Sequence, residues 1–277
     1  MGYEEAFKIA KRHYENFPVV SMLIPAHLRK HVAIVYWFAR TADDSADEGE
    51  VAVSDRLDSL QNFETRLKSL IDGKCNDHFE SALHNTIVTK KLSPEYLFKL
   101  LKAFKQDVIK NRYTNFDELL DYCSNSANPV GRIILELINV KDERAFQLSD
   151  KICTALQLTN FLQDTPIDFN KGRIYFPQDD MKKFDVTEKM FELKENRLNL
   201  NKLVEFSVNR IQTYFDEGKA LLGFLSGKIR YEIDWTISGG EEILKKIRGS
   251  GFDVFLNRPV LSKYDYFKLL LKSIFRI

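Results

Sequence analysis

The chain has 277 residues, and its 41 lysines and arginines almost balance its 40 aspartates and glutamates, giving a formal net charge of +1. This length is enough to bury a substantial core, and the balanced charge argues against a general nucleic-acid binder. The low numbers of glycines (12) and prolines (7) favour long helices over a turn-rich all-β fold. No uncharged apolar run approaches the roughly 20 residues that span a bilayer, and the first twenty residues are unlike a signal peptide.

The three cysteines, Cys75, Cys123 and Cys153, are odd in number and lie far apart in the sequence. This pattern fits neither a disulfide framework nor a Cys-x-x-Cys metal site. It favours a reducing compartment, so we expect a cytoplasmic protein.

The first informative segment, residues 31–39, reads HVAIVYWFA and has the apolar character of a core helix. A cluster of acidic side chains follows at once: Asp43, Asp44, Asp47, Glu48 and Glu50. On a helix, Asp43 and Asp47 share one face and lie about 6 Å apart along the axis. Carboxylates held so close repel each other unless a cation neutralises them. Taken alone, this cluster is also explained by a solvated helix end.

Helical periodicity continues through most of the remaining chain. Residues 94–110 place Leu97, Leu100 and Leu101 on one stripe, and residues 203–215 repeat the pattern. Ser93 before Pro94 is typical of a helix start. No stretch shows the period-two alternation of a strand, and we expect one all-α domain covering residues 1–277.

A second aspartate pair, Asp164 and Asp168, ends the helical pattern of residues 142–164. Pro166 lies between the two, so we expect the helix to bend or end there. Two such pairs on separate helices are suited to Mg²⁺, which takes oxygen ligands and bridges carboxylates to phosphates. The amide oxygen of Asn160 adds to this set.

Two motifs resemble a known family. RTADDSAD (40–47) and QLTNFLQDTPIDFNKGRIYFP (157–177) are similar to the aspartate-rich signatures of the squalene and phytoene synthases, which are head-to-head trans-isoprenyl diphosphate synthases. YCSNSANPVG (122–131) is similar to a third family segment, in which a tyrosine lines the reaction chamber. The resemblance spans roughly residues 10 to 260. It implies an isoprenoid-synthase helical bundle around a central apolar cavity, with Mg²⁺ bridging the aspartates to a substrate diphosphate.

Three further segments resemble one branch of the family, the hydroxysqualene synthases of bacterial hopanoid pathways. They are HYENFPVVS (13–21), SGGEEILKKI (238–247) and NRPVLSKYDYFKLL (257–270). This branch implies a lyase that converts presqualene diphosphate and water to hydroxysqualene and diphosphate. Asn16, Gln163 and Ile167 depart from the serine, arginine and glutamate of many relatives, which weakens the case for a first condensation that seats two diphosphates.

Two alternatives stay open. One is a prenyl transferase that condenses two farnesyl or geranylgeranyl diphosphates to presqualene diphosphate, dehydrosqualene, squalene or phytoene. The other, from a different class, is a non-catalytic isoprenoid-binding or assembly factor. No G-x-G-x-x-G motif for NADPH is found, which favours a non-reductive reaction.

The resemblance assigns roles to individual residues. The implied metal ligands are Asp43, Asp47, Asn160, Asp164 and Asp168. The implied contacts to the diphosphate are Asn16, Arg40, Asp44, Lys171 and Arg173. Aromatic walls that stabilise a carbocation would come from Phe17, Tyr36, Phe38, Tyr122 and Phe161. Tyr175 is a further implied substrate contact. Core packing is the alternative role for these aromatics, and the quenching water has three candidate partners: Tyr122, Gln157 and Gln163.

The C-terminal tail, residues 264–277, combines apolar and basic side chains at helical spacing. It can lie on an anionic membrane surface at the inner face of the membrane, or pack against the domain. The sequence leaves both open, as it does contacts with pathway enzymes.

Overall fold

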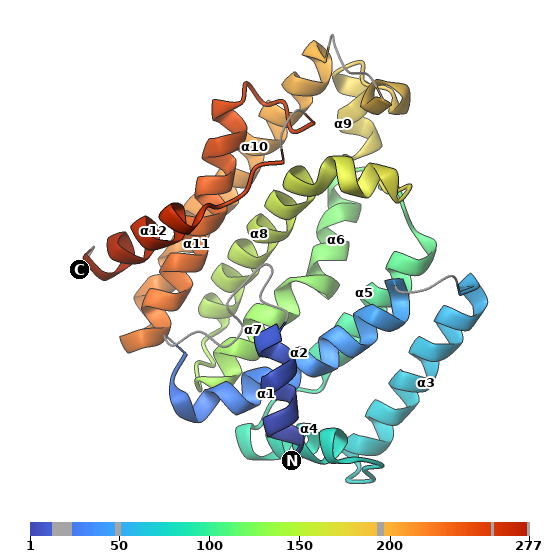
Figure 1. Ribbon diagram of the computed structural model, residues 1–277, viewed down its shortest axis with the longest axis vertical. Helices are drawn as coiled ribbons and strands as arrows, with labels where there is room; N and C mark the ends of the chain where they lie inside the picture. The colour runs from blue at the N-terminus through green and yellow to red at the C-terminus, as the bar shows by residue number, and fades with distance from the viewer. Residues whose placement is uncertain (13–23, 48–50, 193–196, 256–257, 276–277) are drawn as a thin grey trace. The chain divides into compact units, whose positions relative to one another are not determined.

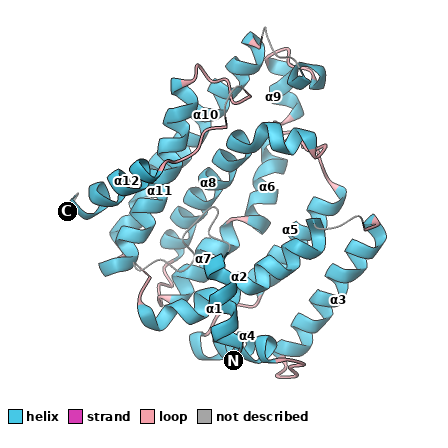
Figure 2. Ribbon diagram, in the orientation of Figure 1, coloured by secondary structure: helices cyan, strands magenta, loops and turns pink. Residues whose placement is uncertain are grey.

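The computed structural model describes residues 1–12, 24–47, 51–192, 197–255 and 258–275. These residues form helices and connecting loops and contain no strand, so the all-α prediction is confirmed (Figures 1 and 2). The helices in chain order are α1 Gly2–Arg12, α2 Ala26–Asp47, α3 Val53–Ile71, α4 His78–Lys90, α5 Glu95–Ile109, α6 Phe116–Ser126, α7 Asn128–Leu137, α8 Glu143–Asn170, α9 Gln178–Lys183, η1 Glu188–Glu192, α10 Leu198–Gly218, η2 Lys219–Phe224, α11 Gly227–Gly249 and α12 Lys263–Phe275. None of the described helices is long and apolar enough to cross a membrane.

The chain divides into two compact units. Unit 1 comprises residues 1–109, 125–147 and 226–232, and unit 2 comprises residues 110–124, 148–225 and 233–277. The division falls inside α6, α8 and α11. The two predicted aspartate motifs therefore belong to different units, with Asp43 in unit 1 and Asp164 in unit 2.

Unit 1 is built around α2, which packs against α1, α3, α4, α5 and α7. Its apolar residues explain this position, because Ala33, Ile34 and Phe38 are at most 2% exposed. The predicted stripe of α5 is also buried, with Leu97 and Leu101 at 0% exposure. Helix α5 begins at Glu95, directly after the Ser93-Pro94 pair that the sequence indicated as a start.

Unit 2 packs α8 tightly against its neighbours at two glycines. A Cβ atom on Gly218 would lie 2.6 Å from Ile152 of α8, and one on Gly240 of α11 would lie 2.8 Å from Leu156. Glycine is needed at these positions for close approach, since both contacts are shorter than real Cβ contacts allow. Helix α8 is thereby held between α10 and α11.

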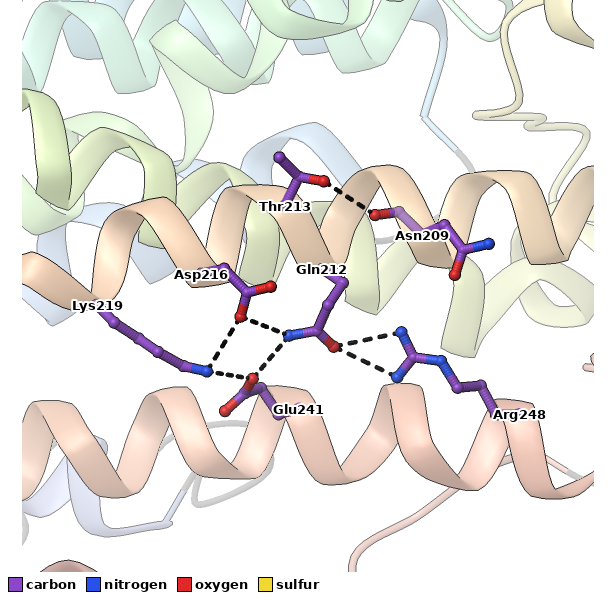
Figure 3. A network of polar contacts seen from close by, with 7 residues as sticks. All are labelled: Asn209, Gln212, Thr213, Asp216, Lys219, Glu241 and Arg248. Atoms are coloured by element: carbon purple, nitrogen blue, oxygen red, sulfur yellow. Dashed lines mark hydrogen bonds and ion pairs between the residues drawn. The ribbon is translucent and has the colours of Figure 1, made fainter.

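A polar network joins α10 and η2 to α11 on the surface of unit 2 (Figure 3). The side-chain amide of Gln212 donates to Glu241 at 2.7 Å and to Asp216 at 3.1 Å, and Lys219 donates to the same two carboxylates. Arg248 donates to the amide oxygen of Gln212 at 3.3 Å. Gln212 and Lys219 each bond to both carboxylates, and this sharing fixes the register of α11 along α10.

Helix α8 does not end at Pro166 but continues to Asn170, and its ribbon bends toward its C-terminal end (Figure 1). Proline has no N–H, so the carbonyl of Leu162 loses its usual helical donor. The hydroxyl of Thr165 replaces it, donating to Leu162 O at 3.1 Å and to Phe161 O at 2.8 Å. Such bonds from a threonine back to the preceding turn accompany helix bends. Of the two predicted outcomes, an end at the proline is ruled out, because α8 continues through it.

Candidate active site

The metal-binding turn predicted on α8 carries a connected set of polar side chains. The amide nitrogen of Asn160 donates to Asp164 Oδ2 at 2.9 Å. The other oxygen, Asp164 Oδ1, accepts from Arg258 Nε at 2.5 Å. One residue earlier, the amide nitrogen of Gln163 donates to the backbone oxygen of Pro259 at 2.6 Å. We call residues 258–262, described throughout, the strap, because they join this turn of α8 to the start of α12.

The end of α8 places Arg173 next to Asp168. The backbone amide of Arg173 donates to the carbonyl of Asp168 at 2.8 Å, and Gly172 turns the chain with φ +77°. A positive φ at the residue after a helix is met most easily by glycine. Arg112 holds this turn by donating to Gly172 O at 2.6 Å and pairing with Glu188 at 2.8 Å. Lys171 lies in the same turn and is exposed.

An aromatic cluster lies beside this turn, formed by Tyr113, Tyr122, Phe161 and Tyr175. The rings of Phe161 and Tyr175 are stacked, with centroids 3.6 Å apart and planes 6° apart. Tyr122 lies 6.0 Å from Phe161 and 5.7 Å from Tyr113, and it is 5% exposed. Two of the four rings, Tyr122 and Phe161, were candidates for stabilising a carbocation, and a third, Tyr175, was a candidate for substrate binding. The cluster brings the three together.

A small cavity in unit 2 borders the cluster and the turn. Its walls include Phe116, Leu158, Phe161, Asp168, Arg173 and Arg210. Arg210 stacks on Phe116 at 4.0 Å and donates to Asp180 at 2.7 and 3.1 Å, so its guanidinium is held on both sides. The cavity leaves about 40 Å³ for water-sized molecules, room for a few waters but too little for an isoprenoid chain. The chamber inferred from the resemblance therefore stays a prediction.

The first aspartate motif ends α2. Arg40 forms ion pairs with Asp44 at 2.7 Å and with Asp43 at 3.7 Å. Burial alone would lower the pKa of Arg40, but the two carboxylates raise it above its ordinary value. Helix α2 ends at Asp47 and has no basic residue in its last turn. Carboxylates there oppose the helix dipole, which disfavours negative charge at a C-terminus by about 0.3–1 kcal/mol each. Arg40 supplies one positive charge to this cluster, and the metal-binding role of the motif stays a prediction.

The remaining candidates have mixed outcomes. Tyr36 and Gln157 are half-buried, and Phe38 is buried against Phe63 in the core of unit 1. Asn16 and Phe17 lie outside the described residues, as does the side chain of Asp47.

The donor atoms fit Mg²⁺, but they are divided between the units. Asp164, Asp168 and Asn160 on α8, and Asp43 on α2, offer the carboxylate and amide oxygens that this ion prefers. Within the described part of the chain, no three His, Cys, Asp or Glu side chains lie close enough together to hold a metal ion. Neither motif, as described, makes a metal centre by itself.

Sequence reasoning missed the strap as a part of the site. Arg258 lies 94 residues from Asp164, and Pro259 lies 96 residues from Gln163, so no local spacing connects them. The sequence did indicate the segment, because residues 257–270 resemble one branch of the family. That resemblance did not indicate that Arg258 would contact Asp164.

The family model "Squalene/phytoene synthase" matches residues 10–265. This chain therefore belongs to the squalene/phytoene synthase family, whose members are isoprenoid synthase enzymes.

Individual relatives support this assignment. A hydroxysqualene synthase from Sinorhizobium fredii is 30% identical over 86% of this chain and 81% of its own length. Another from Zymomonas mobilis is 39% identical over 62% of this chain and 58% of its own. The structure of squalene synthase HpnC from Alicyclobacillus acidocaldarius is 35% identical, with a TM-score of 0.83 over 90% of this chain and 95% of that one. A dehydrosqualene synthase structure has a TM-score of 0.88 over 99% of this chain and 95% of that one, and at 24% identity it shows the fold alone.

Proposed function

We propose that this chain is a hydroxysqualene synthase, which converts presqualene diphosphate and water to hydroxysqualene and diphosphate. The observation that carries the proposal is the turn of α8 where Asn160, Asp164 and Asp168 follow one another at four-residue spacing beside an aromatic cluster. Relatives that are named hydroxysqualene synthase are 30–39% identical to this chain, whereas phytoene synthases are 24–26% identical. This difference supports the lyase over the transferase.

The polar turn would act on the diphosphate. Magnesium, when bound, supplies positive charge that stabilises the departing diphosphate. On α8, Asn160, Asp164 and Asp168 would hold it, together with Asp43 and Asp47 of α2. Arg173 of the turn after α8 would donate to the phosphate oxygens, because a guanidinium matches their geometry. Arg40, Asp44, Lys171 and Asn16 would complete this polar region.

The aromatic cluster would act on the carbon skeleton. The carbon–oxygen bond to diphosphate breaks with its electron pair leaving on oxygen, so a cyclopropylcarbinyl cation forms. The faces of Tyr122, Phe161 and Tyr175 would stabilise it, each by roughly 0.5 to 2 kcal/mol. Phe17 and Tyr36 are the further candidates for such a wall.

The reaction then ends with water. A water oxygen forms the new carbon–oxygen bond to the rearranged cation, and its proton passes to the released diphosphate. Of the three residues proposed to orient this water, Tyr122 is the one in the aromatic cluster. The amide nitrogen of Gln163 is already bonded to Pro259 O, which leaves its oxygen as the free end, and Gln157 is half-buried. We place the enzyme in the cytoplasm, where other enzymes of the pathway would supply presqualene diphosphate.

A condensing enzyme is the second candidate. Phytoene synthases align over 93–95% of this chain, which supports a transferase acting on farnesyl or geranylgeranyl diphosphate. A non-catalytic isoprenoid-binding factor is the third, but such a factor has no need of paired carboxylates at the ends of two helices.

One experiment separates the three. Purified protein and Mg²⁺, without NADPH, are incubated with presqualene diphosphate and, separately, with farnesyl or geranylgeranyl diphosphate, and the products are identified by mass spectrometry. Hydroxysqualene formed from presqualene diphosphate alone supports the proposal. Consumption of either prenyl diphosphate supports the transferase, and no turnover of any substrate supports the binding factor.

A further inference from the structure

Helix α12 exposes apolar side chains along one stripe. Tyr264 is 72% exposed, Phe267 is 61% exposed and Leu271 is 37% exposed. Because an α-helix turns about 100° per residue, these three positions fall within about 60° of one another around the axis. Three large apolar groups on one narrow stripe are more than the scattered exposed residues of an ordinary surface.

The other side of α12 holds the helix in place. Leu269 is 4% exposed, and the ring of Tyr266 meets Trp235 of α11 edge-on at 6.0 Å. Asp265 accepts from the backbone of Ser262 at 2.8 Å and pairs with Lys246 of α11 at 3.0 Å. The packed face and the exposed stripe coexist, so the two roles predicted for the tail are not exclusive.

Positive charge accompanies the exposed stripe. Lys263 and Lys268 are exposed, and among the described residues neither forms an ion pair. The carboxylate of Asp265, the one acidic group of α12, is already paired with Lys246. The outer face of α12 is therefore apolar and basic, which is complementary to an anionic lipid surface.

We propose that the outer face of α12 docks onto an anionic lipid bilayer. Tyr264, Phe267 and Leu271 enter the headgroup region, and Lys263 and Lys268 contact the anionic headgroups. The strap connects this face to the aspartate turn of α8 through the contacts of Arg258 and Pro259. Docking is independent of the proposed reaction, because it uses residues that take no part in it.

The test is co-sedimentation of the full chain with vesicles of phosphatidylcholine containing phosphatidylglycerol, and with vesicles of phosphatidylcholine alone. We expect binding to the anionic vesicles that weakens as salt is raised, since salt screens the lysines. The double variant Tyr264→Ser/Phe267→Ser should lose at least about tenfold in affinity. Lys263→Gln and Lys268→Gln should each lose about fivefold on anionic vesicles.

The matched control is Val88→Ser on α4, which removes a single apolar residue that is 60% exposed. It should bind as the unchanged protein does, and circular dichroism checks that every variant is folded. Failure of the unchanged protein to sediment with anionic vesicles overturns the proposal, as does full binding by the double variant. A dimer in solution that the double variant dissociates also overturns it, because a second copy would then cover the stripe.

Discussion

Arg258 Nε lies 2.5 Å from Asp164 Oδ1, so a residue between α11 and α12 neutralises the central carboxylate of the aspartate turn. The pair is partly exposed, with Arg258 at 42% and Asp164 at 18%. An ion pair of this exposure contributes about 0–1 kcal/mol to stability. A divalent cation can therefore readily displace Arg258 from Asp164.

Arg258→Gln is expected to lower the Mg²⁺ concentration that half-saturates activity, by up to about fivefold, because the variant removes a competitor for Asp164. The measurement is a magnesium titration of the turnover rate at saturating substrate. Lys245→Gln, which removes an exposed cation elsewhere on unit 2, is the control and should leave the titration unchanged. A higher magnesium requirement in Arg258→Gln would show that Arg258 is not a competitor.

Asp164→Asn is expected to reduce kcat/KM by at least about a hundredfold without unfolding the protein, because it removes charge that holds the metal at the leaving diphosphate. Asp168→Asn should behave in the same way. Asp179→Asn on α9 removes an exposed carboxylate of the same unit and should stay near the normal rate. Near-normal rates in both active-site variants would refute the metal assignment.

Thr165→Val is expected to destabilise the protein by about 1–3 kcal/mol, because Leu162 O then loses the hydroxyl that stands in for the missing amide of Pro166. Thr159→Val removes a hydroxyl bonded to Ala155 O at 2.7 Å, but that carbonyl keeps the backbone amide of residue 159. The control should therefore lose less than about 1 kcal/mol. The measurement is the free energy of unfolding of both variants by chemical denaturation. Equal losses would contradict the inference that the Thr165 hydroxyl replaces the donor missing at Pro166.

Two adjacent glycines of α11 should respond in opposite directions. A Cβ on Gly240 would lie 2.6 Å from the ring of Phe215, which is 0% exposed, so Gly240→Ala should cost about 1–3 kcal/mol. A Cβ on Gly239 would meet only Leu261, at 3.5 Å. Gly239→Ala should leave stability unchanged or raise it by up to about 1 kcal/mol through its better helix propensity. Thermal unfolding of both variants provides the comparison, and a stable Gly240→Ala would mean that α11 is not closely packed against Phe215 of α10.

The buried His31 should make unit 1 sensitive to acid. It is 4% exposed, and its Nδ1 shares a hydrogen bond of 2.9 Å with Thr86. Burial, with the charges of Lys90 and Lys30, lowers the pKa of His31 from 6.5 to about 4. The unfolded chain therefore takes up the proton first as pH falls. The stabilisation is complete above pH 6.5 and is lost toward pH 4, at up to about 1.4 kcal/mol per pH unit.

His31→Asn keeps a polar group near the Nδ1 position but cannot titrate, so it should flatten the dependence of the unfolding free energy on pH over this range. His27→Asn changes an exposed histidine four residues earlier, whose charge is the smallest of the effects that lower the pKa of His31, so it should change the slope far less than His31→Asn does. The measurement is denaturant unfolding at several pH values. An unchanged slope in His31→Asn would assign the acid sensitivity to other groups.

Most of the helices could be predicted from the sequence, because burial repeats along a helix every three to four residues. Leu97 and Leu101 of α5 illustrate this, since their spacing alone indicated a buried face. The order of Asn160, Asp164 and Asp168 along one helix was predictable for the same reason. The path of the chain at Pro166 was not predictable. A helix can continue past a proline when another group donates to the carbonyl left without its amide, here Leu162 O, and the sequence does not show which group can reach it. The strap was also beyond prediction, since its partners on α8 are set by the tertiary fold.

The contact of Gln163 with Pro259 uses only a backbone oxygen of the strap. Any amino acid that follows the same path can supply that oxygen, so substitution at residue 259 is a weak probe of it. Chain length is the strong probe. Inserting one residue between α11 and Arg258 would shift the register of the loop and draw the guanidinium away from Asp164, while every side chain of the motif stayed unchanged.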